Sequence, residues 1–97
     1  MDLHNFYTGN CFDAYEYLGV HKHKNGFIFR VFAPNAKKVS LIGDFNNWTE
    51  EDMTAILDGN FYELFIPNAK TGMKYLHRIY KETGGYTDHC DIYGYAI

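Results

Sequence analysis

Long apolar runs are missing from this sequence. No stretch of about 18 consecutive apolar residues occurs, which argues against a transmembrane helix. The first six residues, Met1 to Phe6, contain neither a basic segment nor a long apolar segment, so they do not read as a secretory signal. We therefore expect a cytoplasmic protein with no membrane partner.

Cysteine is also scarce. The chain has two cysteines, Cys11 and Cys90, which are too few for a disulfide framework, and we expect both to be reduced thiols. A nucleophilic pair of Cys90 with His89 is disfavoured, because adjacent residues of an extended segment point in opposite directions.

An excess of basic residues is absent as well. Nine Lys and Arg stand against 12 Asp and Glu, for a net charge of −3 with His neutral. A protein that binds the phosphate backbone of nucleic acids needs a basic face, and a polybasic membrane anchor needs clustered Lys and Arg. We expect neither kind of partner.

The residue patterns of common catalytic sites are not found. The chain has no GxGxxG or GxxxxGK[ST] motif, and 97 residues are too few for an eight-stranded α/β barrel of about 250 residues. The acidic residues fall in turns or on exposed strand faces, where nothing apolar would raise a carboxyl pKa. His21 and His23 are interleaved with lysines that would repel a metal ion. We predict no catalytic residues, no metal and no cofactor.

Aromatic residues, in contrast, are abundant. Eight Phe, nine Tyr and one Trp occur in a chain that is 46% hydrophobic, which is enough for the core of one small domain over residues 1–97. The tail from Asp91 to Ile97 ends in apolar and aromatic residues, without a charge after Asp91. Such an end usually packs against something, so we expect the 97 residues to be a piece of a longer protein.

Short strands bounded by turn residues dominate the pattern. A helix is predicted over 10–18, with Asn10 as N-cap and Gly19 after its end. Residues 21–26 are predicted to be a polar turn. Asp58-Gly59-Asn60 is a strong hairpin signal, although the arm around Ala55 is short. The strands are predicted over 27–32, 38–42, 53–57, 61–66 and 74–80. Their spacing indicates an all-β, antiparallel β-sandwich.

The loop from Gly43 to Trp48 is the strongest candidate for a binding site. A flat indole beside amide side chains suits a sugar, because the ring matches the C–H face of glucose and Asn both donates and accepts hydrogen bonds. From the residues alone the alternative stays open that Trp48 caps a small core.

The stretch from Phe32 to Trp48, FAPNAKKVSLIGDFNNW, resembles the signature of the family 48 carbohydrate-binding module. This immunoglobulin-like β-sandwich precedes the catalytic barrel in glycogen branching enzymes (1,4-α-glucan branching enzymes) and in their relatives of glycoside hydrolase family 13. The flanks narrow the resemblance to the branching enzymes. Residues 12–21 resemble their N-terminal helix, 61–67 one of their strands, and 91–96 the segment before the barrel, with Ile92 in place of a proline. The resemblance implies a leading segment over 1–20 and the start of a linker over 88–97.

The resemblance also implies a function and site residues. The carboxylates of branching enzymes lie in the barrel, so a non-catalytic module is expected, with α-1,4-glucan (glycogen or maltooligosaccharide) and its own barrel as partners. Trp48 would stack on glucose, Asn46 and Asn47 would hydrogen-bond to it, and Tyr86 would be a second aromatic contact. Leu76 stands where glucan-binding members carry a Lys, so binding is expected to be weak. A purely structural docking domain and a free-standing glycogen-targeting module are the alternatives.

Overall fold

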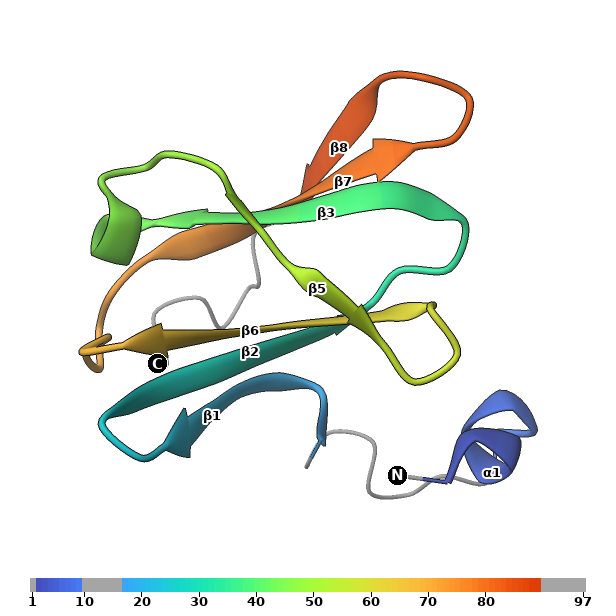
Figure 1. Cartoon of the computed structure of the whole chain (residues 1–97), viewed down its shortest axis with the longest axis horizontal. Coiled ribbons are helices and arrows are strands. Elements are labelled where there is room, and N and C mark those ends of the chain that lie inside the picture. Colours follow the sequence, from blue (N-terminus) through green and yellow to red (C-terminus); the bar gives the residue numbers. More distant parts are fainter. Residues whose placement is uncertain (1, 10–16, 90–97) are drawn as a thin grey trace.

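The computed structural model describes residues 2–9 and 17–89, and their strands form two stacked sheets (Figure 1). The first sheet has the order β1-β2-β6-β5 and the second the order β4-β3-β7-β8, with every pairing antiparallel. The elements are α1 (Leu3–Tyr7), β1 (Gly19–His23), β2 (Gly26–Phe32), β3 (Ala36–Gly43), the 3-10 turn η1 (Asp44–Asn46), β4 (Glu51–Asp52), β5 (Thr54–Ile56), β6 (Phe61–Pro67), β7 (Tyr75–Lys81) and β8 (Tyr86–His89). The predicted antiparallel β-sandwich is confirmed.

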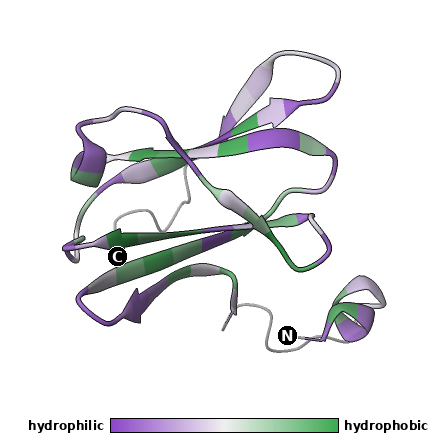
Figure 2. Cartoon of the chain, in the orientation of Figure 1, coloured by the Kyte–Doolittle hydropathy of each residue, from purple (hydrophilic) through white to green (hydrophobic). Residues whose placement is uncertain are grey.

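The core lies between the two sheets. Phe29 of β2, Val39 and Leu41 of β3 are completely buried, and Tyr62, Ile66 and Tyr75 pack with them. These positions alternate along their strands, as expected for sheets with one face against a core. The hydropathy colouring follows the same pattern, with hydrophobic strand segments and hydrophilic turns (Figure 2).

The predicted hairpin at Asp58-Gly59 is confirmed. Ile56 pairs with Phe61 across the turn, and Gly59 has a φ of 90°, a left-handed conformation that glycine adopts without strain. The short arm pairs over Thr54–Ile56, so the region around Ala55 is shorter than the predicted 53–57. Met53 instead donates its backbone N–H to Val39 O in the other sheet at 2.9 Å, and the chain changes sheets at this residue.

The prediction of a polar turn over 21–26 was wrong in extent. Residues up to His23 belong to β1, and the turn itself consists of Lys24 and Asn25. A polar edge strand is hard to recognise from sequence because one side of it faces solvent and only Val20 packs toward the core. The strand β8 was missed for the same reason.

The N-terminal helix is α1, which was not predicted. Asp2 caps it by accepting hydrogen bonds from the backbone N–H groups of His4 (3.0 Å) and Asn5 (3.4 Å). The predicted helix over 10–18 lies outside the described residues except for Tyr17 and Leu18. Of the predicted linker over 88–97, the first two residues belong to β8 and the others are outside the described part of the chain.

Aromatic rings hold α1 against the first sheet. The ring of Phe6 meets those of Phe32 and Phe61 edge to face, with centroids 4.9 and 5.2 Å apart. The Tyr7 hydroxyl donates to Asp58 Oδ2 at 2.6 Å, and this hydrogen bond lowers the pKa of Asp58 and raises that of Tyr7. The helix is thus fastened to the turn between β5 and β6.

Candidate functional site

The candidate loop begins at Gly43, the last residue of β3. A Cβ atom at this position would lie 2.7 Å from Lys74 O and 2.8 Å from the Phe45 ring, so only glycine fits. The close approach allows Asp44 N–H to donate to Lys74 O at 3.0 Å, while Lys74 N–H donates to Asp44 Oδ2 at 2.9 Å. The reciprocal pair joins the loop to the start of β7.

Asn46 stabilises the loop from within. Its Nδ2 donates to Leu41 O at 3.1 Å, and its Oδ1 accepts from Gly43 N–H at 3.0 Å. One N–H and one lone pair of the amide remain beyond these two bonds. Asn46 therefore acts first on the shape of the turn, a role that sequence reasoning did not assign to it.

The indole ring of Trp48 is fixed by a hydrogen bond at its N–H edge, and about half of the residue is exposed to solvent. Its Nε1 donates to Asp44 Oδ1 at 2.8 Å, its backbone N–H donates to Gly43 O at 2.9 Å, and the residue is 47% exposed. Asn47 and Trp48 both have left-handed φ angles, 57° and 59°. Asn tolerates this conformation, whereas for Trp it is strained, and such strain gathers at ligand sites. The loop thus exposes the indole to solvent and holds the Trp48 backbone in a strained conformation.

We predict that acid will release the indole. The hydrogen bonds from Lys74 N–H and from Trp48 Nε1 lower the pKa of Asp44 below its usual value of 3.8. A carboxyl whose pKa is lowered by folding stabilises the folded state above that usual value, and this contribution is lost as the pH falls through the folded pKa. Trp48 fluorescence is therefore expected to change below about pH 4. In Asp44→Asn the transition should be absent, and its persistence there would contradict the assignment.

The outer face of β7, turned away from the first sheet, carries the remaining candidates. Tyr75 and His77 are buried in the core, so Leu76, Arg78 and Tyr80 alternate onto the outer face. Leu76 is opposite Ile42 and adjacent to the Gly43 end of β3. Leu76 and the Trp48 loop therefore lie at the same end of the sheet.

Tyr86 lies at the other end of this face. It pairs with Tyr80, which is opposite Lys38, and the rings of Tyr80 and Tyr86 are 5.7 Å apart. Four residues of β7, about 13 Å, separate Leu76 from Tyr80. Tyr86 is 53% exposed. The structure thus gathers Asn46, Asn47 and Trp48 in one loop and places Tyr86 at a distance along the same sheet.

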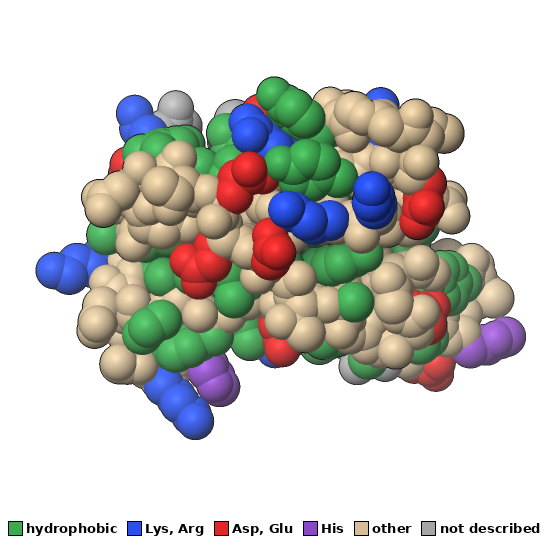
Figure 3. Space-filling model, turned by 45° about the horizontal axis from the view of Figure 1, so that its top comes forward, with side chains coloured by type: hydrophobic (Ala, Val, Ile, Leu, Met, Phe, Trp, Pro, Cys, Tyr) green, Lys and Arg blue, Asp and Glu red, His purple; other side chains and the backbone are tan. Residues whose placement is uncertain are grey.

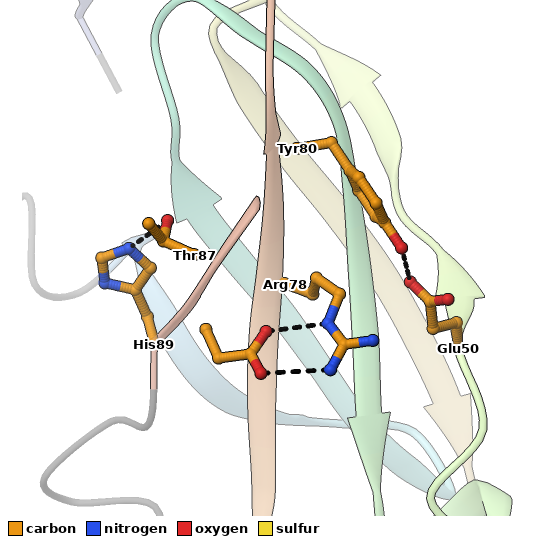
Figure 4. Close-up of polar contacts among 6 residues, drawn as sticks. Glu50, Arg78, Tyr80, Thr87 and His89 are labelled. Atoms are coloured by element: carbon orange, nitrogen blue, oxygen red, sulfur yellow. Dashed lines mark hydrogen bonds and ion pairs between the residues drawn. The ribbon is translucent and has the colours of Figure 1, made fainter. Parts of the chain in front are cut away.

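Arg78 and Tyr80, whose side chains lie next to the Tyr86 ring, belong to a polar network on β7, and Figure 4 shows their bonds. Arg78 donates to both carboxylate oxygens of Asp88, from Nε at 2.8 Å and Nη2 at 3.1 Å, and its guanidinium carbon lies 4.3 Å from the centre of the Tyr86 ring. The hydroxyl of Tyr80 donates to Glu50. Figure 3, in which the upper layer of Figure 1 comes forward, shows acidic, basic and hydrophobic side chains interspersed on one face.

Each carboxylate of this network is bonded to a cation or to a hydroxyl donor: Asp88 to Arg78, Asp52 to Lys38, and Glu50 to the Tyr80 hydroxyl. The hydrogen bond from Arg78 lowers the pKa of Asp88, and the bond to Glu50 raises that of Tyr80. Lys38 lies 4.8 Å from the centre of the Tyr80 ring and 3.4 Å from Asp52 Oδ1. Arg78, Tyr80 and Glu50 were missed by sequence reasoning, although the alternation along 74–80 already separates Arg78 and Tyr80 from the inward residues.

The metal site and the membrane-spanning helix, neither of which the sequence predicts, can be compared with the described residues. Within residues 2–9 and 17–89, no group of three or more His, Cys, Asp and Glu side chains is arranged to hold a metal ion. His21 Nε2 instead lies 2.7 Å from Leu18 O, and His23 meets the ring of Phe65. None of the helices in the described part of the chain is long and apolar enough to cross a membrane.

Comparison with known proteins identifies the family. A family model described as carbohydrate-binding module 48 (isoamylase N-terminal domain) matches residues 17–94. The 1,4-alpha-glucan branching enzyme GlgB of Francisella tularensis subsp. novicida is 42% identical over 98% of this chain, and that of Francisella philomiragia is 38% identical over the same share. The chain spans 16% of the length of each of these relatives.

Solved structures support the same fold. A pullulanase from Paenibacillus barengoltzii crystallised with maltotriose superposes with a TM-score of 0.63, at 20% identity, over 87% of this chain and 15% of that one. The same pullulanase with maltohexaose and alpha-cyclodextrin gives a TM-score of 0.62 at 19% identity, with the same coverage. The family model covers most of the 97 residues, including every strand of the two sheets, and the expected resemblance is confirmed: the chain belongs to the carbohydrate-binding module 48 family.

Proposed function

We propose that this chain is a non-catalytic module of a cytoplasmic 1,4-α-glucan branching enzyme of glycogen synthesis and that it contacts α-1,4-glucan weakly. The observation that carries the proposal is the exposed, strained and hydrogen-bonded Trp48 in a member of a carbohydrate-binding family. The branching enzymes that it resembles are about six times longer, so the chemistry of branching would belong to the rest of such a protein. The module would supply a contact with the substrate rather than a catalytic group.

Each site residue has a physical task in this proposal. The indole of Trp48 stacks on one glucose ring, because its flat face is open and its edge is fixed by Asp44. Asn47 is exposed beside it and offers an amide to sugar hydroxyls, while Asn46 holds the turn and has one N–H and one lone pair left. Tyr86 is the second aromatic contact, further along the sheet.

The affinity is expected to be low. Stacking on a single aromatic ring is worth about 1–3 kcal/mol, and Leu76 supplies no charge where glucan-binding members have a Lys. A dissociation constant on the order of 1 mM for maltoheptaose is therefore expected. The test is a titration of the 97-residue chain with maltoheptaose, followed by Trp fluorescence and backbone amide shifts. Unchanged spectra at 20 times that concentration would instead favour the second candidate, a structural domain that supports the catalytic barrel.

Restoring a cation at position 76 should strengthen binding. In Leu76→Lys the new ammonium would project from the outer face of β7 at the end where the Trp48 loop lies. One charged hydrogen bond is worth about 1.5–3 kcal/mol, so the dissociation constant should fall by about tenfold or more. Leu57→Lys is the matched control, because Leu57 is 52% exposed and lies in the turn between β5 and β6 of the first sheet. Equal strengthening by both substitutions would show a general charge effect and contradict a site at Leu76.

A further inference from the structure

The two arginines of the chain are built into the sandwich in the same way. Arg30 lies on β2 and Arg78 on β7, each on the outer face of an inner strand. Each donates from Nε to a carboxylate on the neighbouring strand at 2.8 Å, Arg30 to Glu63 and Arg78 to Asp88. Each guanidinium carbon lies 4.3 Å from the centre of a tyrosine ring. The pair provides an internal comparison.

The Arg30 and Arg78 sites differ in the other bonds of the guanidinium and in the exposure of the tyrosine ring. The Arg30 guanidinium also donates from Nη1 to Tyr17 O at 3.3 Å, and its ring partner Tyr17 is only partly exposed. Arg78 instead makes a second bond to Asp88, from Nη2 at 3.1 Å, and its ring partner Tyr86 is 53% exposed. Arg30 therefore links β2 to β6 and to the segment at Tyr17, whereas Arg78 lies against the ring of Tyr86, which is exposed to solvent.

Holding Tyr86 in place has little value for stability alone. Exposed ion pairs add little to the free energy of unfolding, and the Arg78–Asp88 pair lies at the surface of an edge hairpin. Its value for binding is larger, because a ring that is already ordered loses less conformational freedom when a ligand arrives. The guanidinium lies over the ring, and because Tyr86 is 53% exposed, part of the ring surface is left for a flat ligand.

The surrounding groups suit a neutral, hydroxylated ligand. Glu50 engages the hydroxyl of Tyr80, whose ring is next to Tyr86, and Lys38 is paired with Asp52. Near Tyr86, in the described part of the chain, two cations, Arg78 and Lys38, stand against three carboxylates, Asp88, Asp52 and Glu50, so there is no excess of positive charge to attract an anionic ligand. A guanidinium has five N–H hydrogens, of which Asp88 takes two and Tyr80 engages a third, so two remain for the hydroxyl groups of a sugar.

We propose that Arg78 and Asp88 are positioning residues that hold the ring of Tyr86 ready to stack on a glucose unit of an α-1,4-glucan. The inference rests on the proposed function and adds to it the residues that orient the second aromatic contact. Arg30 and Glu63, although alike in geometry, have no part in binding.

The experiment compares matched variants of the 97-residue chain with maltoheptaose as the probe. Arg78→Gln removes the ion pair and the stacked charge, and the dissociation constant should rise about fivefold, because the ligand must then itself order the Tyr86 ring. Arg78→Lys keeps the charge without the planar fork and should recover part of this loss. Arg30→Gln should bind within about twofold of the wild type, because Arg30 lies on β2 in the other sheet and shares no partner with Tyr86 among the described residues.

A spectroscopic signature separates positioning from mere folding. Arg30 and Arg78 are the only arginines in the sequence, so the chain has two side-chain Nε–H signals, which the two Gln variants assign. Addition of maltoheptaose to the wild type should shift the Arg78 signal and leave the Arg30 signal in place. The shift is measured on the wild-type chain, and either Gln variant that folds is enough to assign both signals.

The outcomes distinguish the two levels of the proposal. Loss of binding in Trp48→Ala together with wild-type affinity in Arg78→Gln and an unmoved Arg78 signal would overturn the role of Arg78 and leave the proposed function standing. Equal weakening by Arg30→Gln and Arg78→Gln would also overturn it, since the effect would then not depend on Tyr86. A wild-type chain that does not respond to maltoheptaose would overturn the proposed function, and the positioning role with it.

Discussion

Trp48→Ala is expected to abolish the response of this chain to maltoheptaose while leaving the fold intact. Stacking on the indole is worth about 1–3 kcal/mol, and its loss from an affinity on the order of 1 mM puts binding beyond detection. Folding should be little affected, because Trp48 is 47% exposed and does not belong to the buried cluster. The measurements are backbone amide shifts during titration and thermal unfolding by circular dichroism.

Two further variants control this result. Trp48→Phe keeps a smaller flat ring and should retain part of the binding, which separates the aromatic face from the indole N–H. Leu57→Ala removes a side chain of similar exposure from the distant β5–β6 turn and should change nothing. If Trp48→Ala lowers the free energy of unfolding by about 3–5 kcal/mol, the indole is a core cap after all and the sugar platform must be sought elsewhere.

Phe29→Ala should have the largest effect on stability. Phe29 is completely buried at the centre of β2, where its ring meets those of Phe45 and Tyr75 with centroids 5.3 and 5.0 Å away. Removing such a ring costs about 3–5 kcal/mol, from lost transfer energy and from the cavity left behind. The free energy of unfolding of a small domain is about 5–15 kcal/mol in total, so the variant should lose a large part of it.

Chemical denaturation measures this prediction directly. The midpoint in urea should fall sharply in Phe29→Ala with the slope unchanged, because the same surface is exposed on unfolding. Phe65→Ala is the comparison variant. Phe65 stands between Leu64 and Ile66, which both pack toward the core, so its own side chain lies on the outer face of β6 and is only partly buried. A loss as large in Phe65→Ala as in Phe29→Ala would contradict the position of the core between the sheets.

The sheet framework was predictable because its signals are local. The strands β2, β3, β6 and β7 consist of β-branched and aromatic residues between turn residues, and the predicted ranges are within about two residues of those observed. The Asp58-Gly59 hairpin depends on a left-handed glycine in the turn itself. The edge strands β1, β4 and β8 escaped prediction because short polar strands gain their order from a neighbour rather than from their own pattern.

The amino-acid sequence by itself determined the sandwich, the polar loop with its lone tryptophan, and the family resemblance, since all three follow from residue type and spacing along the chain. That the indole of Trp48 is exposed rather than buried as a cap on the core was decided by the tertiary structure. Only the tertiary structure decided how the site is held. Asp44, which accepts from Trp48, is itself held by the backbone N–H of Lys74, 30 residues away, and the stacking of Arg78 on Tyr86 depends on the register of β7 with β8. The contacts of Asp44 with Lys74 and of Arg78 with Tyr86 form only when the strands pair, and register is set by packing of the whole sheet.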